Sequence, residues 1–126
     1  MKEKLIELIK NSYAPYSNVH FACIVETKNG NFYKGVNIEN ASFGGTICAE
    51  RNAINAAITN GEKEIVALYL LGDLDVIAYP CHICKQTFTE FLNEKTIFNI
   101  MNIKGDMKVL TYKELMNTTF SKDDMK

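Results

Sequence analysis

The segment EIVALYLLG, at residues 64–72, constrains the fold of this 126-residue chain more than any other stretch. It has the length of a strand, and it is too apolar to present a solvated face. A strand of this kind has to be covered on both sides, which is typical of a central strand in a sheet that carries helices. The segments around it must therefore supply neighbouring strands and helical layers.

The remaining apolar segments supply these elements. Apolar residues recur on one side of three segments, which predicts helices, and Asn29-Gly30 is a turn signal between two strand-like segments. The predicted elements are a helix at 3–12, a hairpin around 29–30, helices at 46–61 and 81–93, strands near 97–101 and 107–110, and a helical turn at 112–116. Together they predict an α/β fold with three α/β/α layers and a central mixed sheet of about five strands.

Length and charge limit the class of protein. A chain of this length fits one domain, which we expect to span residues 1–126. The net charge is −1 and no dense Lys/Arg cluster occurs, so no nucleic-acid or acidic-membrane partner is expected. The apolar segments are too short to cross a membrane, and the charged N-terminus lacks a signal-peptide core. These features predict a cytoplasmic protein.

The chain has four cysteines, Cys23, Cys48, Cys81 and Cys84, and the last two form a C-x-x-C pair. In a reducing compartment this pair alone leaves catalytic zinc, structural zinc and redox chemistry open. Cys48 and the pair each lie where a loop enters a predicted helix, and helix N-termini favour the thiolate. Two neighbouring helix starts would direct three thiolates at one point, whereas Cys23 suits a buried strand.

Two residues that follow Cys48 are of types that an open zinc site uses. The carboxylate of Glu50 could take a proton from a water molecule beside the zinc and pass it to a substrate. Three thiolates give a zinc centre net negative charge, which Arg51 would offset by donating hydrogen bonds to sulfur. Arg51 is the only arginine in the chain.

CAERNA at 48–53, followed by PCHIC at 80–84, resembles the cytidine deaminase family. The resemblance continues in YAPYSN (13–18), NIENASFGGTICAER (37–51), PCHICKQTFTEF (80–91) and, more weakly, YKELMNTTF (112–120). It covers nearly the whole chain. It implies the family's α/β fold, a zinc cofactor and the hydrolysis of cytidine or deoxycytidine to uridine or deoxyuridine plus ammonia, a reaction of pyrimidine salvage.

The same resemblance implies a role for each matching residue. Cys48, Cys81 and Cys84 would bind zinc, and Glu50 would carry protons to N3 of the cytosine ring and to the departing ammonia. The main-chain N–H of Ala49 would hold the carbonyl group of the base. Arg51 would contact the metal ligands without binding the metal itself.

The resemblance also implies how the nucleoside sugar is held. Asn37 and Glu39 would bind the ribose hydroxyls, and their i, i+2 spacing would place both side chains on one side of an extended segment. Phe120 would pack on a base held by a neighbouring subunit, because small deaminases of this type form homotetramers.

Several positions depart from the family pattern, including Ile83 between the last two cysteines and Asn117, which replaces a proline of the tail. Val19 stands where the family has a phenylalanine that packs against the base, and Tyr79 stands where it has a small residue on the ammonia side. His82 replaces a small residue between the last two cysteines, and Lys85 replaces an arginine. These departures predict an intact metal site with a modified substrate pocket.

Three alternatives remain at this point. A thioredoxin-like oxidoreductase would explain the C-x-x-C pair, but not Cys48, Glu50 and Arg51. A closed structural zinc site would need Cys23 or His82 as the fourth ligand. A related deaminase would act on another aminopyrimidine nucleoside such as blasticidin S, although the NIEN segment favours a ribose and so cytidine.

Overall fold

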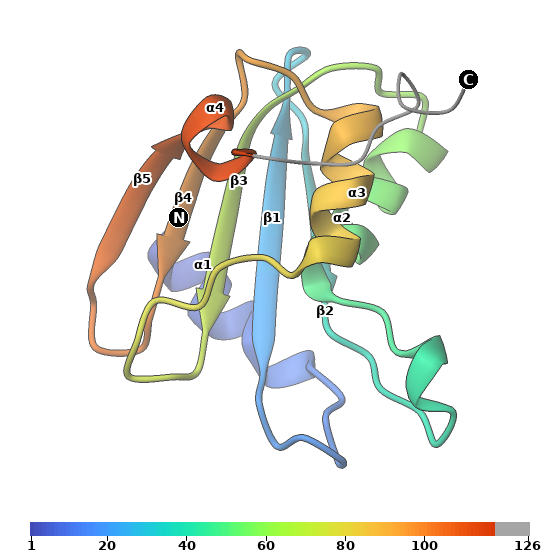
Figure 1. Cartoon of the computed structure of the whole chain (residues 1–126), viewed down its shortest axis with the longest axis vertical. Coiled ribbons are helices and arrows are strands. Elements are labelled where there is room, and N and C mark those ends of the chain that lie inside the picture. The colour runs from blue at the N-terminus through green and yellow to red at the C-terminus, as the bar shows by residue number, and fades with distance from the viewer. Residues whose placement is uncertain (118–126) are drawn as a thin grey trace.

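The structure, a computed structural model, describes residues 1–117 (Figure 1). Within that range five strands form one sheet in the order β2-β1-β3-β4-β5, with β3 antiparallel to β1 and parallel to β4. The elements are α1 (Lys2–Leu8), η1 (Ile9–Asn11), β1 (Phe21–Thr27), β2 (Phe32–Val36), η2 (Phe43–Gly45), α2 (Ala49–Thr59), β3 (Ile65–Gly72), α3 (His82–Phe91), β4 (Ile97–Met101), β5 (Met107–Thr111) and α4 (Tyr112–Leu115). No helix within these residues is long and apolar enough to span a membrane.

β3 occupies the centre of the sheet, as its apolar sequence predicts. On one face Leu68 and Leu70 join a core that includes Phe88 of α3 and residues of α2. On the other face Leu71 packs with Leu5 of α1. Figure 1 shows α1 behind the strands, while α2 and α3 lie together at the other face. The predicted three-layer α/β fold with a mixed sheet is therefore confirmed.

The helices predicted at 46–61 and 81–93 were too wide at both ends, and the helix predicted at 3–12 begins at Lys2 and ends at Leu8, where η1 continues to Asn11. α2 begins at Ala49 rather than at residue 46, because Ile47 forms a β-bridge with Ile38 and Cys48 is extended (φ −72°, ψ 156°). α3 likewise begins one residue after an extended Cys81. In both helices a cysteine is thus the N-cap residue, although its side chain makes no capping hydrogen bond.

Close packing holds the start of α2 against β2. A Cβ atom on Gly35 would come within 2.4 Å of main-chain atoms of α2, so only glycine permits this approach. Asn52 in the first turn of α2 donates from Nδ2 to the Val36 carbonyl at 2.8 Å. Because β2 runs directly into residues 37–39, these contacts bring that segment next to the cysteine at the helix start.

Candidate active site

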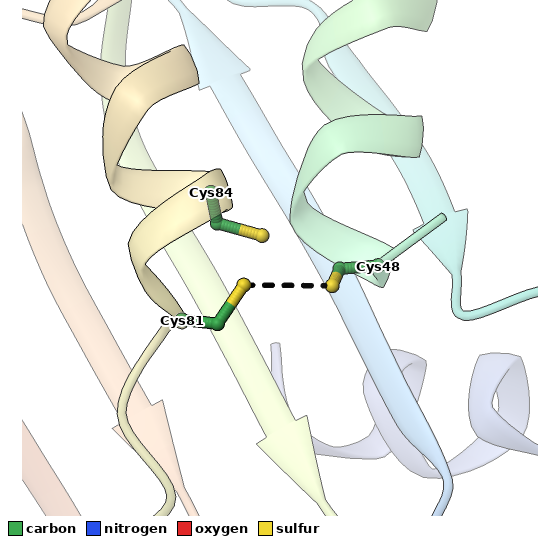
Figure 2. Close-up of side chains that lie close together, drawn as sticks. All are labelled: Cys48, Cys81 and Cys84. Carbon is green, nitrogen blue, oxygen red and sulfur yellow. Dashed lines mark hydrogen bonds between the residues drawn. The ribbon is translucent and has the colours of Figure 1, made fainter. Parts of the chain in front are cut away.

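The three cysteines of the motif meet between the starts of α2 and α3. Figure 2 shows the side chains of Cys48, Cys81 and Cys84 pointing toward one another from the two helices. Their sulfur atoms all lie within 4.8 Å of one another, and Cys48 Sγ lies 3.8 Å from Cys81 Sγ. None of the four cysteines forms a disulfide, and the fourth, Cys23, is fully buried in the core.

This arrangement fits a zinc ion. Zinc–sulfur bonds of about 2.3 Å in a tetrahedron place two sulfurs about 3.8 Å apart, and the Cys48–Cys81 separation has this value. Within residues 1–117 the cluster has three possible ligands and includes neither Cys23 nor His82, so these residues do not form the closed four-ligand site considered above. Three protein ligands with one position open are typical of catalytic zinc.

Charge around the cluster favours thiolate at the start of α2. A hydrogen bond with Cys84, assisted by the Arg51 guanidinium, lowers the pKa of Cys48 to about 5 despite partial burial. Hydrogen bonding to Cys48 and burial raise the pKa of Cys84. Arg51 Nη2 lies 3.6 Å from Cys48 Sγ and 3.2 Å from the Thr46 carbonyl. Burial lowers the pKa of Arg51, but its interactions with Cys48 outweigh this and raise it.

Glu50 lies in the first turn of α2, and its side chain is almost completely buried. Burial, together with the negative charge of Cys48, raises the pKa of Glu50 to about 7. A carboxyl group with a pKa near neutrality can both take up and release a proton at physiological pH. The residue therefore has the electrostatic properties of a general acid and base next to the sulfur cluster.

A cavity of about 280 Å³ opens in front of Glu50 and the cysteines. This volume is just below the range of about 300–1,000 Å³ for small-molecule pockets. The residues that line it are Ser17, Val19, Phe21, Asn37, Glu39, Thr46, Cys48, Glu50, Tyr79 and Cys81. Two cysteines of the cluster, Glu50 and the two residues predicted to bind a sugar thus face one small pocket.

Hydrogen bonds to the protein hold Asn37 and Glu39 in place. Asn37 accepts the Phe21 N–H at Oδ1 and donates from Nδ2 to the Val19 carbonyl, each at 2.9 Å. Glu39 accepts the N–H groups of Tyr16 and Ser17 at Oε1, at 3.0 and 3.1 Å, and the Ser17 hydroxyl at Oε2. The Ser17 hydroxyl in particular, with these N–H groups, lowers the pKa of Glu39 and keeps it ionised.

The other residues singled out in the sequence have different positions. Ala49 is the first residue of α2, so its N–H has no acceptor within the helix. Tyr79 lines the pocket, as its family position implies, whereas His82 is exposed and Lys85 does not line the pocket. Phe120 lies outside the described residues. Its role, like those of Ala49, Asn37 and Glu39, stays a prediction.

Sequence reasoning missed three residues of the pocket wall. Phe21, Ser17 and Thr46 line the cavity, but none was assigned a role. Phe21 opens β1, and a Cβ on Gly72 would lie 2.7 Å from its ring, so the glycine makes room for the aromatic side chain. A phenylalanine two positions after the departure at Val19 was the signal available for Phe21.

Comparison with known proteins agrees with this geometry. Residues 1–100 match the family described as "Cytidine and deoxycytidylate deaminase zinc-binding region". The chain is 33% identical over 123 residues to a cytidine deaminase of Halalkalibacterium halodurans, with 98% of this chain and 93% of the relative covered. It is 34% identical to a cytidine deaminase of Mycoplasma genitalium, with 95% of this chain and 92% of the relative covered. The crystal structure of cytidine deaminase from Burkholderia pseudomallei superposes with a TM-score of 0.85 at 31% identity, covering 95% of this chain and 99% of that one.

The fold and the three-sulfur cluster first define an α/β protein with a catalytic type of zinc site. The family match, which spans most of the chain, narrows this class: the chain belongs to the cytidine and deoxycytidylate deaminase family. Zinc is the metal of that family, and the residues present here fit it. The thioredoxin-like alternative is not favoured, because it explains neither this fold match nor the third sulfur.

Proposed function

We propose that this protein is a zinc-dependent cytidine deaminase that converts cytidine or deoxycytidine and water into uridine or deoxyuridine and ammonia. The observation that carries this proposal is one pocket with two chemically different walls. One wall presents Cys48, Cys81 and Glu50, and the other presents Asn37 and Glu39. The first suits hydrolysis at an aromatic C–N bond, and the second suits a sugar.

Proton transfer is assigned to Glu50. Bound by the three sulfurs, zinc would supply a Lewis acid that lowers the pKa of a water molecule to about 7. Glu50 takes one proton from this attacking water and delivers it to N3 of the base. It then takes the second proton, from the hydroxyl group now on C4, and delivers it to the leaving amino nitrogen. The C4–O bond forms and the C4–N bond breaks, so that water is consumed and ammonia is released. The Ala49 N–H holds the carbonyl oxygen of the base.

The charge of the pocket favours a nucleoside over a nucleotide. The residues of the described chain that line the cavity include two glutamates, Glu39 and Glu50, and no lysine, arginine or histidine. A phosphate group would need such cations or a cluster of N–H donors. We therefore propose that cytidine and deoxycytidine, rather than deoxycytidylate, are the substrates. Asn37 and Glu39 contact the sugar hydroxyls.

The test is direct conversion. Purified protein loaded with zinc is incubated in turn with cytidine, deoxycytidine, deoxycytidylate and blasticidin S, and product and ammonia are quantified. We expect deamination of the two nucleosides and little turnover of the nucleotide. Preferred turnover of deoxycytidylate or blasticidin S would overturn the substrate assignment. No turnover of any of the four, by a folded protein with bound zinc, would overturn the function.

We also propose that the enzyme is a cytoplasmic homotetramer made of one catalytic domain per chain. Exposed apolar side chains near the pocket support association, namely Tyr13, Tyr16, Ile38, Phe43, Ile47 and Tyr79. Tyr16 and Phe43 contact each other edge to face, with ring centroids 5.5 Å apart. Reduced cysteine ligands suit a cytoplasmic location. Light scattering at several protein concentrations measures the assembly, and a stable monomer would contradict it.

Within such a tetramer we assign Phe120 a contact with the base bound by a neighbouring subunit. The test mixes Glu50→Gln, which we expect to be inactive, with Phe120→Ala, which we expect to have a raised KM for cytidine, and lets their subunits exchange. If Phe120 acts in trans, mixed tetramers contain sites with an intact Glu50 and a partner's intact aromatic ring, and activity returns. No recovery in verified mixed tetramers would contradict the assignment.

A further inference from the structure

The side-chain amide of Asn37 has a defined orientation. Its Oδ1 accepts the main-chain N–H of Phe21 at 2.9 Å, and its Nδ2 donates to the main-chain carbonyl of Val19 at 2.9 Å. A main-chain N–H can only donate and a carbonyl can only accept. These two partners therefore settle which end of the amide is oxygen, and they leave the second N–H of Nδ2 for the pocket that Asn37 lines.

Ser12 and His20 continue this arrangement. The Ser12 hydroxyl bonds to Asn37 Oδ1, and His20 Nδ1 lies 2.9 Å from Ser12 Oγ. A hydroxyl has one proton, and Asn37 Oδ1 can only accept, so Ser12 donates to Asn37. His20 must then donate from Nδ1 to Ser12.

Another acceptor for Ser12 is less suitable. The main-chain carbonyl of Asn37 lies 3.5 Å from Ser12 Oγ, at the long limit for a hydrogen bond, and it already accepts the Tyr13 N–H at 3.1 Å. A Ser12 proton directed at His20 would leave two oxygen acceptors facing each other at short range. The direction from His20 through Ser12 to Asn37 is the arrangement without that repulsion.

We propose that Ser12 and His20 are positioning residues for substrate binding. The chain of hydrogen bonds from His20 Nδ1–H to Ser12 Oγ–H to Asn37 Oδ1 fixes the amide so that it presents an N–H to a sugar hydroxyl. The carboxylate of Glu39 accepts a hydrogen bond from that hydroxyl, so the pair recognises a group that both accepts and donates. This inference rests on the proposed function, because it takes Asn37 to face the sugar.

The main chain holds both positioning residues. The His20 N–H donates to Asp73 Oδ1 at 2.8 Å, and the Asp73 N–H donates to the His20 carbonyl at 3.0 Å. The Ser12 N–H donates to the Ile9 carbonyl at 3.1 Å, at the end of η1. The first helical segment and the sheet thus hold the chain of hydrogen bonds at its two outer residues.

The first test reads the direction of the chain without any substrate. Nitrogen NMR of the zinc-loaded protein, labelled at histidine, reports which ring nitrogen of neutral His20 carries the proton; His20→Asn assigns the signal. We expect protonation at Nδ1. Neutral His20 protonated at Nε2 would overturn the direction and with it the proposal. In Ser12→Ala we expect the Nδ1–H preference to be lost.

The second test measures binding of the sugar. We expect Ser12→Ala to raise the KM for cytidine by about 3- to 10-fold, the effect of one hydrogen bond, with little change in kcat. Ser12→Thr retains the hydroxyl and should restore the KM. Ser12→Ala should barely change the inhibition constant of 2′,3′-dideoxycytidine, because this ligand lacks the 2′ and 3′ hydroxyls. An equal loss for both ligands would indicate general damage and overturn the positioning role.

A matched pair at His20 provides a further check. The side-chain nitrogen of His20→Asn can replace the Nδ1 donor, whereas His20→Asp, of the same size, can only accept at neutral pH. We expect a larger KM for cytidine in the aspartate variant than in the asparagine variant, and equal values would contradict the proposal. If wild-type protein did not deaminate cytidine, the proposed function would fail, and the His20 tautomer would still test the hydrogen-bond chain separately.

Discussion

The two walls of the pocket are built in different ways. The metal wall comes from two helix starts, so Cys48 and Cys81 are N-cap residues and Glu50 lies in the first turn of α2. The sugar wall comes from residues 12–20 and from the segment after β2, and hydrogen bonds between side chains and main chain hold it. Reactive groups thus lie on regular structure, while the groups assigned to the sugar lie on loops.

The two glutamates of the pocket show what this difference does. Burial raises the pKa of Glu50 to about 7, whereas hydrogen bonds from Ser17 and Tyr16 lower the pKa of Glu39. The residue type is the same and both side chains are nearly inaccessible. The number of donors around each carboxylate decides whether it exchanges protons or remains a fixed acceptor.

Removing a metal ligand should have the largest effect. We expect Cys84→Ala to lose bound zinc and activity, and to lower the free energy of unfolding by about 4 kcal/mol or more, because metal binding is coupled to folding. Metal analysis and urea denaturation measure both. Cys23→Ala is the matched control and should keep its zinc. Full zinc content in Cys84→Ala would remove this residue from the ligand set.

Exchanging each glutamate for glutamine compares the two walls directly. We expect Glu50→Gln to lower kcat by about 10²- to 10⁴-fold, the usual contribution of a general acid and base, with zinc retained. Glu39→Gln should instead raise the KM for cytidine by about 10- to 100-fold, because a charged hydrogen bond to the sugar is weakened. Steady-state kinetics separate these outcomes. A Glu39 variant that lost kcat, or a Glu50 variant that lost only affinity, would break the comparison.

The sequence predicted which cysteines form the metal wall, because local spacing fixes part of it and the family resemblance joins Cys48 to the pair 33 positions later. Two residues separate Cys81 from Cys84 at a helix start, and one residue separates Cys48 from Glu50. The apolar pattern of β3 likewise predicted its central place and the two helical layers. The helix starts were less predictable, because the Ile38–Ile47 bridge that delays α2 is a tertiary contact.

The sugar wall was predictable only where the family resemblance named its residues. Asn37 and Glu39 were identified in this way, but their supports were not. Their supports lie on loops: Ser12 contacts Asn37, Ser17 contacts Glu39, and His20 contacts Ser12. Local periodicity does not encode contacts between residues as far as 25 positions apart, as in the Ser12–Asn37 pair. Loop conformation depends on the packed sheet and so lies outside local pattern analysis.

Removing the aromatic ring of Phe21, or moving it to position 19, should change the KM for cytidine by a smaller factor. Val19 and Phe21 both line the pocket, so we expect Phe21 to supply the ring that the family places at position 19. Phe21→Leu should raise the KM for cytidine by about 2- to 10-fold, as for loss of one aromatic contact. Adding Val19→Phe to that variant should recover part of the affinity. If Phe21→Leu left the KM unchanged, Phe21 would not replace the aromatic ring that the family has at position 19.

The smallest effect concerns the acid stability that Glu39 contributes. Its pKa is lowered in the folded protein, relative to about 4.3 for an unfolded glutamate. The stabilisation is therefore complete above the unfolded pKa and is lost as pH falls through the folded one. Wild type should exceed Glu39→Gln in urea midpoint at pH 7, and the gap should narrow below about pH 4.

Glu62, whose pKa is lowered by Asn31 and Tyr33, is the matched control. The difference in urea midpoint between wild type and Glu62→Gln should also narrow at low pH, but the KM for cytidine should not change, since Glu62 lies outside the pocket lining. A gap that stayed constant with pH for Glu39→Gln alone would mean that its donors hold the side chain without favouring its charge.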